Sequence, residues 1–270
     1  MMSDPTWLTA DHDLDRPNGA RIYDFYLGGQ NNLLCDRTYA RRLLALVPDL
    51  RHAALENRAC MRRVVRMFAE RGIRQFLDLG SGIPTAGNTH ETAREVAPDC
   101  RVVYVDSEPM AVAHGELLLD GDPNTAIVRK DVRDVRAVLD DEQTRRLLDF
   151  DQPVAVLLFA LMQFIPDDDD PEGMLGQYRD ALVPGSYLAL SHLTGDDRPE
   201  EMEAVRQLTM HEGRPNTLRS RERVRELLAG FELVEPGVVH LPQWRPDPGH
   251  RDDEIPVDRS MAYVAVGCKP

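Results

Sequence analysis

The feature that most constrains the fold is an alternation that begins at residue 73, where short apolar runs are separated by stretches of helical periodicity. This order is typical of βαβ units, in which helices connect the strands of a mostly parallel sheet. The predicted strands are residues 76–79, 102–105, 126–128, 154–159 and 187–190, and the predicted helices are 89–96, 110–119, 142–148, 174–182, 200–211 and 221–228.

The end of the chain follows a different pattern. Two β-rich segments, 231–240 and 261–266, have no helix between them, which predicts an antiparallel pair at the sheet edge. The sequence therefore predicts an α/β fold with a mostly parallel sheet of seven strands and an antiparallel edge hairpin.

The residues before the sheet have helical character. Segments 20–27 and 36–47 read as helices, and a third helix is amphipathic, with Met61, Val64, Val65 and Phe68 on one face. We expect residues 1–55 to form an N-terminal helical cap and residues 56–270 to form the sheet domain.

Charge and cysteine content exclude several classes of protein. With 32 basic and 46 acidic residues, the net charge of -14 repels phosphate backbones and anionic lipids, so we expect no nucleic-acid and no membrane partner. The four cysteines form no CxxC pair, which argues against a zinc site and against disulfides. The longest apolar run, 154–162, is far below the ~20 residues of a membrane helix, and no signal peptide is visible. We expect a cytoplasmic protein without a catalytic metal.

The strongest motif is a glycine turn after the first predicted strand. Asp78, Gly80 and Gly82 lead from this strand into a helix, and such a turn brings a ligand close to the backbone. A dinucleotide fingerprint requires a third glycine where Thr85 stands, so pyrophosphate binding is disfavoured. Asp78 suits a ligand with a positive amino group. The alternative is an ordinary turn between a strand and a helix.

Two more carboxylates follow the next two strands. Asp106 can accept both hydroxyls of a ribose, and Asp131 can accept a hydrogen bond from the exocyclic amine of adenine. Each alone could be a helix cap or a surface charge. Ligands of open α/β sheets bind outside the carboxyl ends of the strands, so the three acids meet at one edge. Amino group, ribose and adenine together describe S-adenosylmethionine.

The chain also resembles a known family. The turn with Asp106 and Asp131 is similar to that of class I S-adenosylmethionine-dependent methyltransferases. Residues 20–29, 56–58, 82–88, 103–106 and 185–192 resemble an actinobacterial methyltransferase-like family first catalogued as a domain of unknown function. The resemblance covers roughly residues 18–268 and implies the methyltransferase sheet, an added helical part and S-adenosylmethionine binding. It implies no particular methyl acceptor. We count Ser107, Val132 and Phe159 among the expected cofactor contacts.

The chain departs from the family pattern at two places. Gln30-Asn31 stands where relatives carry a charged pair, and Gln163 stands where they carry a histidine after the fourth strand. A histidine there can act as a base, whereas a glutamine only orients a nucleophile through hydrogen bonds. His192, after the fifth strand, is the other candidate on the acceptor side. It reads either as a base or as an ordinary hydrogen-bonded histidine.

Three further features each have two interpretations. Tyr23, with its aromatic neighbours, either packs in the cap or covers the cofactor sulfonium, which aromatic faces attract. The acidic run 167–170 either holds a hard cation or is a solvated loop before a helix. The arginine cluster 214–225 is either a solvated helix face or a grip on an acidic substrate.

The sequence predicts a bacterial S-adenosylmethionine-dependent methyltransferase that acts on a small molecule by in-line transfer. The alternative is a protein that binds S-adenosylmethionine or S-adenosylhomocysteine as a sensor or assembly factor, without transfer. The acceptor and the oligomeric state stay open, with a homo-oligomer as one option.

Overall fold

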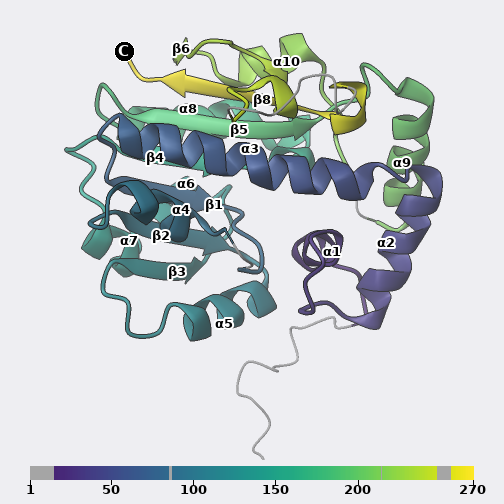
Figure 1. Ribbon diagram of the computed structural model, residues 1–270, viewed down its shortest axis with the longest axis horizontal. Coiled ribbons are helices and arrows are strands. Elements are labelled where there is room, and N and C mark those ends of the chain that lie inside the picture. Colours follow the sequence, from purple (N-terminus) through teal and green to yellow (C-terminus); the bar gives the residue numbers. More distant parts are fainter. Residues whose placement is uncertain (1–14, 85–86, 214, 248–256) are drawn as a thin grey trace, which may run out of the picture.

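A computed structural model describes residues 15–84, 87–213, 215–247 and 257–270. Its centre is one sheet with strand order β3-β2-β1-β4-β5-β8-β6, in which β7 also pairs with β8 (Figure 1). The strands are β1 Gln75–Leu79, β2 Arg101–Asp106, β3 Thr125–Arg129, β4 Ala155–Leu158, β5 Tyr187–Leu193, β6 Glu232–Leu233, β7 Val239–His240 and β8 Ala262–Cys268. β1 to β5 are parallel, and β8 runs antiparallel to β5, β6 and β7.

The α/β fold class is confirmed, with one difference at the edge of the sheet. Segment 231–240 forms two short strands, β6 and β7, so the sheet has eight strands where seven were predicted. The interruption has a local cause. Pro236 has no N–H to donate to a neighbouring strand, and Gly237 closes a turn by donating its N–H to the backbone oxygen of Val234 at 2.9 Å.

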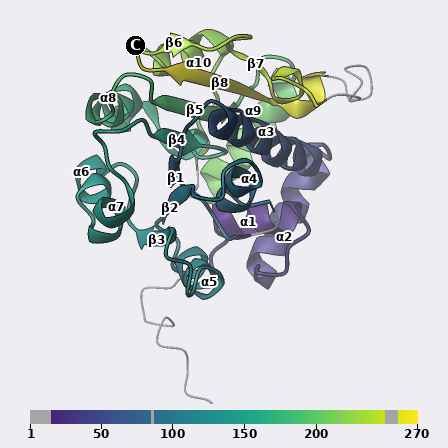
Figure 2. The same ribbon diagram turned by 60° about the vertical axis from the view of Figure 1, so that its left-hand side comes forward.

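Helices cover both faces of the sheet. α3 Leu50–Glu70, α4 Thr89–Val96 and α5 Pro109–Leu118 lie on one face. α6 Val135–Leu139, α7 Glu142–Leu147, α8 Pro171–Ala181 and α10 Arg221–Leu227 cover the other (Figure 2). The alternation of side chains along β1 divides the core accordingly. Phe76 packs with α3 and α4, whereas Leu77 and Leu79 pack with α6 to α8.

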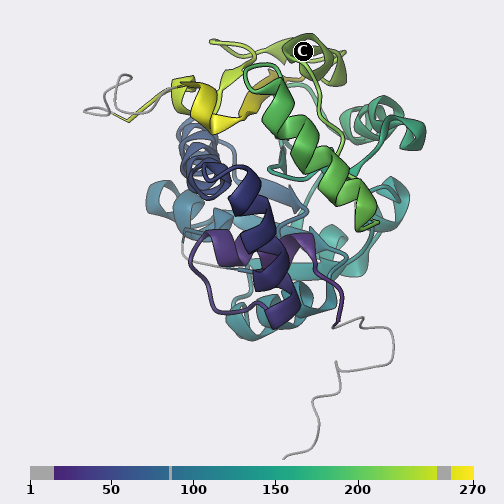
Figure 3. The same ribbon diagram turned by 90° about the vertical axis from the view of Figure 1, so that its right-hand side faces the viewer.

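The cap closes the carboxyl ends of the parallel strands. It consists of α1 Gly19–Tyr26, α2 Leu34–Leu46, the first turns of α3 and α9 Pro199–His211, which share a third apolar cluster. Figure 3 shows the purple N-terminal helices beside the green α9. The cap thus contains a helix from the second half of the chain. The proposed division at residue 55 lies within α3, which takes part in both the cap cluster and the sheet core.

Buried polar contacts join the cap to the sheet. The side chain of Asn18 caps α1 by accepting from Ala20 N at 2.7 Å. Arg21, on α1, is 3% exposed and pairs with Asp36 of α2 at 2.7 Å and with Glu108, in the loop after β2, at 2.9 Å. Because removing one partner leaves an unpaired buried charge, this cluster fixes α1 beside the loop that carries Asp106.

Within the part of the chain that the structure describes, no helix combines the length and apolarity needed to span a membrane. All four cysteines are free, and Cys60 and Cys100 are buried.

Candidate active site

A cavity of about 530 Å³ lies between the carboxyl ends of the strands and the cap. Its walls come from the loops after β1 to β5 and from α1, α2, α3 and α9. Every site residue predicted from the sequence lines this cavity: Tyr23, Asp78, Gly80, Gly82, Asp106, Ser107, Asp131, Val132, Phe159, Gln163 and His192. Residues that the sequence placed at five strand ends and in the cap thus line the same cavity. Their individual roles stay predictions.

The glycine turn after β1 has the backbone that an open cradle requires. Gly80 and Gly82 have φ values of 68° and 67°, in the left-handed region that favours glycine. A Cβ on Gly80 would lie 2.6 Å from Leu161 Cδ1, so a side chain there requires Leu161 to move. Ser81, between the glycines, has a buried hydroxyl without a partner among the described residues. The turn therefore offers backbone and one unpaired polar group to a ligand. Thr85, which bears on the dinucleotide alternative, lies outside the described residues.

Asp78 is a buried carboxylate on the α4 side of β1. Its Oδ2 accepts a hydrogen bond from Thr89 Oγ1 at 2.6 Å. Burial raises the pKa of Asp78 to about 6, with a further increase from the nearby Asp106, while the Thr89 hydrogen bond and the charge of Arg58 oppose the shift. A positive ligand group beside Asp78 would offset the cost of keeping this carboxylate charged.

Asp106 is held by the backbone at both oxygens. Its Oδ2 accepts from Gly82 N at 2.7 Å and its Oδ1 from Glu108 N at 2.8 Å. Burial raises the pKa of Asp106, against these backbone hydrogen bonds. Each carboxylate oxygen has two lone pairs, so both can accept a second donor such as a sugar hydroxyl.

Asp131 differs from the other two acids because it is half-exposed and paired. Arg133 donates to both of its oxygens, at 2.6 to 3.1 Å, and also reaches Asp169 at 2.6 Å. These hydrogen bonds hold the pKa of Asp131 below its usual range. Asp131 thus lies at the rim of the cavity with Arg133 beside it, and its neighbour Val132 is buried.

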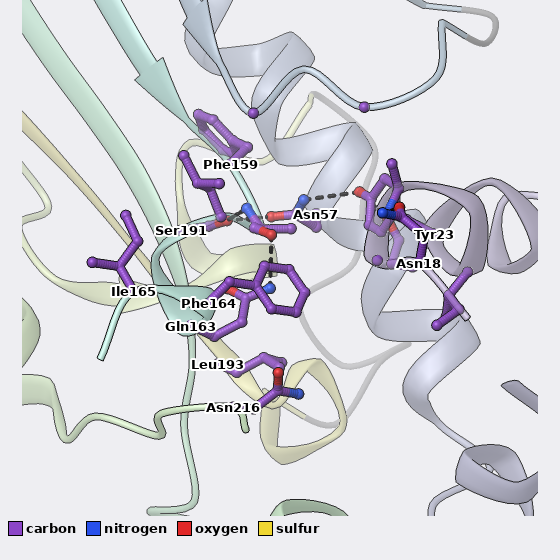
Figure 4. Close-up of a pocket in the computed structure, with 18 of the residues that line it drawn as sticks. Asn18, Tyr23, Asn57, Phe159, Gln163, Phe164, Ile165, Ser191, Leu193 and Asn216 are labelled. Atoms are coloured by element: carbon purple, nitrogen blue, oxygen red, sulfur yellow. Dashed lines mark hydrogen bonds between the residues drawn. The ribbon is translucent and has the colours of Figure 1, made fainter. Parts of the chain in front are cut away.

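A chain of hydrogen bonds crosses the cavity from β5 to α1 (Figure 4). Ser191 accepts from Ala160 N at 2.8 Å and donates to Asn57 Oδ1 at 2.6 Å. Asn57 Nδ2 donates at 2.8 Å to the Tyr23 hydroxyl, which donates to the backbone oxygen of Ala54 at 3.1 Å. This chain fixes Tyr23 against the first turns of α3.

The ring of Tyr23 already has a cation near it. The guanidinium carbon of Arg58 lies 5.7 Å from the ring centroid. The guanidinium also acts on Asp78, and its Nε is buried without a hydrogen-bond partner in the described ranges. Beyond the family resemblance of residues 56–58, the sequence predicts no role for Asn57 and Arg58. Their signal in the sequence is the polar run 56–58 within an otherwise amphipathic helix.

Gln163 lies in a 3-10 turn, Met162–Phe164, that follows β4. Its Nε2 donates to the backbone oxygen of Ala160 at 2.7 Å, which fixes the orientation of the carboxamide. Its Oε1 is buried and accepts from no group in the described part of the chain. Figure 4 shows the side chain below Ser191 and Asn57, beside the ring of Phe164.

His192 is occupied at both ring nitrogens. Nδ1 lies 2.8 Å from the backbone oxygen of Leu193, and Nε2 lies 2.6 Å from Arg219 Nη1. Since the guanidinium only donates, Nε2 is the acceptor and Nδ1 carries the proton. Burial and the Arg219 charge lower the pKa of His192 to about 3. The ring is neutral and has no free lone pair for a substrate proton, so we do not propose it as a base.

Arg219, which precedes α10, is an exception to the interpretation of the cluster 214–225 as a solvated helix face. It is 3% exposed and donates to the backbone oxygens of Met162 and Ile165 at 3.0 and 2.8 Å, and to Asp167 at 2.7 Å. It therefore fastens the loop that carries Gln163 to His192 of β5. Arg214 lies outside the described residues.

The acidic run 167–170 has structural partners in the described chain. Asp167 pairs with Arg219, and Asp170 caps α8 by accepting from Gly173 N at 3.0 Å. These contacts match the interpretation of a charged loop before a helix.

A parallel sheet with an antiparallel last strand, a glycine turn after β1 and carboxylates after successive strands define the class I S-adenosylmethionine-dependent methyltransferases. The chain belongs to the S-adenosyl methyltransferase family, whose model matches residues 5–270. The predicted family, cofactor and enzyme class are thereby confirmed, and the enzyme is favoured over a protein that only binds the cofactor.

Two similar solved structures come from actinobacteria. A candidate methyltransferase of Thermobifida fusca is 40% identical, with a TM-score of 0.91 over 98% of this chain and 99% of its own. A DUF574 family protein of Streptomyces avermitilis is 38% identical, with a TM-score of 0.92 over 96% and 99%. Human N-acetylserotonin methyltransferase, 14% identical, has a TM-score of 0.50 over 94% of this chain and 63% of its own, which shows the fold alone. No curated protein matches the sequence.

Proposed function

We propose that the protein transfers the methyl group of S-adenosylmethionine to a small molecule held between the sheet and the cap. The observation that carries this proposal is the cavity of about 530 Å³, which has carboxylates at one end and cap side chains at the other. Its volume lies within the range of small-molecule sites, roughly 300 to 1,000 Å³.

The roles proposed for the cofactor-binding residues follow from their positions. Asp78 receives the amino group, Asp106 the ribose hydroxyls and Asp131 the adenine amine, and the Arg58 Nε–H suits the cofactor carboxylate. Gly80 and Gly82 admit close backbone approach. Ser107, Val132 and Phe159 line the space for the adenosine, and Tyr23 lines the cap side.

When bound, S-adenosylmethionine would supply a methyl group on a positively charged sulfur: the lone pair of the acceptor atom would form the new bond to carbon as the carbon–sulfur bond breaks, the positive charge would pass from sulfur to the acceptor atom, and that atom would then lose its proton to solvent. The task of the protein is to hold the acceptor atom about 3 to 3.5 Å from that carbon and to exclude water. Gln163 orients the acceptor, because it lines the cavity and its fixed carboxamide has a buried oxygen without a hydrogen-bond partner in the described chain. Arg219 donates to the backbone oxygen of Met162 and to the neutral His192, and it thereby supports the loop that carries Gln163.

Incubation with methyl-labelled S-adenosylmethionine and a size-fractionated bacterial extract tests the proposal. We expect label in a small-molecule fraction. Label confined to protein or nucleic acid contradicts a small acceptor, and binding without any transfer indicates a sensor.

Two glycine variants provide the matched control. Gly80→Ala places a Cβ 2.6 Å from Leu161 Cδ1, so Leu161 or the turn must shift within the cavity lining, and labelling should fall. Gly121→Ala has the same left-handed strain, with a φ of 78°, but no atom within 4 Å of the added Cβ. It should retain labelling if the shift of the turn or of Leu161, rather than loss of stability, is the cause.

We also propose a cytoplasmic protein of actinobacterial origin without a nucleic-acid partner. Four free thiols, the net charge of -14 and the actinobacterial relatives support this proposal. Self-association stays a prediction, which light scattering over a range of protein concentrations would measure.

A further inference from the structure

Among the described lining residues, charged side chains are confined to one end of the cavity. Of the described lining residues, six charged ones follow β1, β2 and β3 or lie within them: Asp78, Asp106, Glu108, Lys130, Asp131 and Arg133. The seventh, Arg58, lies close enough to Asp78 to lower its pKa. These residues surround the place proposed for the cofactor, which itself carries charged groups.

The opposite end is lined by cap side chains and by the loops after β4 and β5. Its apolar wall comes from Ile22 of α1, Leu43 of α2, Leu50 of α3, Leu193 of β5 and Val205 of α9. We call this end the acceptor chamber. Among its described residues the only ionisable groups are tyrosines and His192.

An ion in the acceptor chamber would have no counter-charge among the lining residues that the structure describes. His192 is neutral, and the Arg219 guanidinium behind it is already engaged by two backbone oxygens, by His192 and by Asp167. Burial of an unpaired charge is strongly unfavourable, so the chamber selects against carboxylates, phosphates and ammonium groups.

The chamber is not wholly apolar, because three uncharged polar atoms lack partners. Gln163 Oε1, Asn216 Oδ1 and the Tyr26 hydroxyl are buried atoms without a hydrogen bond to the described chain. Gln163 is 5% exposed, and its Nε2 is committed to Ala160, so its oxygen can only accept. A buried acceptor left unpaired costs free energy, which a donor on a ligand would recover.

We propose that the methyl acceptor is an uncharged, largely apolar molecule that donates one N–H or O–H to Gln163 Oε1. This inference rests on the proposed function and names the chemical class of its substrate. A neutral aromatic amine and a phenol share this chemistry, and the test separates them.

Matched two-ring compounds probe the chamber in the presence of saturating S-adenosylhomocysteine. Calorimetric titration compares three kinds of probe. The neutral donors are 1-naphthylamine and 1-naphthol, and the neutral compound without a donor is 1-methylnaphthalene. The charged probes are 1-naphthoate and 1-naphthylmethylammonium. We expect the neutral donors to bind at least about tenfold more tightly than either ion. Labelled cofactor then shows whether the amine or the phenol accepts methyl.

Gln163→Leu isolates the role of the unpaired oxygen. It should weaken the binding of 1-naphthylamine and 1-naphthol by roughly threefold to tenfold and leave 1-methylnaphthalene unaffected. Gln143→Leu, an exposed glutamine of α7, is the control and should change none of these affinities. Far-ultraviolet circular dichroism and S-adenosylhomocysteine affinity verify that each variant is folded.

Four outcomes would overturn the proposal: tightest binding of a charged probe, no binding of any probe, an equal loss for 1-methylnaphthalene in Gln163→Leu, or no loss at all in that variant. Failure of the wild-type protein to bind S-adenosylhomocysteine would instead refute the proposed function, so the two failures are distinguishable.

Discussion

Binding of S-adenosylmethionine should weaken as the pH falls below about 6, because Asp78 must be ionised to receive the cofactor amino group. Burial raises the pKa of this carboxyl from 3.8 to about 6, so it is protonated in much of the free protein at pH 5. The positive amino group favours the ionised form, and the protonated carboxyl must lose its proton for the ion pair to form.

The size of the effect follows from this pKa. If only the ionised form binds, the dissociation constant increases by a factor of one plus the ratio of protonated to ionised carboxyl. With a pKa of about 6, this factor is roughly 11 at pH 5 and close to 1 at pH 7, so affinity should fall about tenfold between them. Loss of the amino proton, near pH 8, should weaken binding again.

The raised pKa of Asp78 affects the stability of the free protein in the opposite direction from the cofactor affinity. The unfolded chain ionises near pH 4, whereas folded Asp78 ionises near 6. Its contribution is therefore present below pH 4 and is lost as the pH rises through 6. Affinity and stability should change in opposite directions across this window.

Calorimetric titration from pH 5 to 8 measures the effect, and two threonines of α4 give matched variants. Thr89→Val removes the 2.6 Å hydrogen bond that opposes the shift, so the loss of affinity should begin at a higher pH. Thr92→Val changes a buried threonine whose hydroxyl has no partner among the described residues, and it should leave the profile unchanged. Asp78→Asn should bind weakly and without this pH dependence. The same acidic limb in Asp78→Asn and wild type would refute the reasoning.

Other predictions concern the cofactor and the loop supports. Asp106→Asn presents an NH2 group to one of the two backbone donors, so calorimetry should show roughly a tenfold to hundredfold loss of cofactor affinity; an unchanged affinity would assign Asp106 to structure alone. Tyr23→Ala should cost more affinity for S-adenosylmethionine than for the uncharged product, by about 0.5 to 2 kcal/mol if the ring faces the sulfonium, whereas equal losses mean that it only packs. Arg219→Ala should lower the free energy of unfolding by about 3 kcal/mol in chemical denaturation and impair methyl transfer more than cofactor binding. It should also raise the pKa of His192 in an NMR titration, and an unchanged pKa would contradict the contact between the two side chains.

Most of the sheet could be predicted because its strands are nearly continuous apolar runs between breakers. The parallel strands agree with the predicted ones to within about three residues at either end. The exception, 231–240, is apolar enough for one strand, but the turn at Pro236 and Gly237 interrupts it. The sequence pattern did not place the start of α3, for another reason. Leu50 and Ala54 face the cap, so they lie outside the stripe of Met61 and Phe68 that faces the sheet.

The cofactor end of the site was predictable because parallel strands bring their carboxyl ends to one edge. Asp78 and Asp106 needed only this rule and the glycine turn. No such rule predicts the residues that support the acceptor end of the cavity. Arg219 follows β4 by more than fifty residues, and only the folded chain shows that its guanidinium is buried against Met162 and His192. An arginine among other arginines carries no local sign of burial.

The course of α3 limits how the enzyme can be divided or altered. One continuous helix supplies Leu50, Ala53 and Ala54 to the cap and Met61 and Phe68 to the sheet core. A fragment that begins at residue 56 would lose α1 and α2 and leave the apolar side of α9 open to solvent. The cap is therefore no exchangeable module, and new acceptor ranges are better sought by substituting single side chains of α1, α2 and α9 than by grafting a cap from a relative.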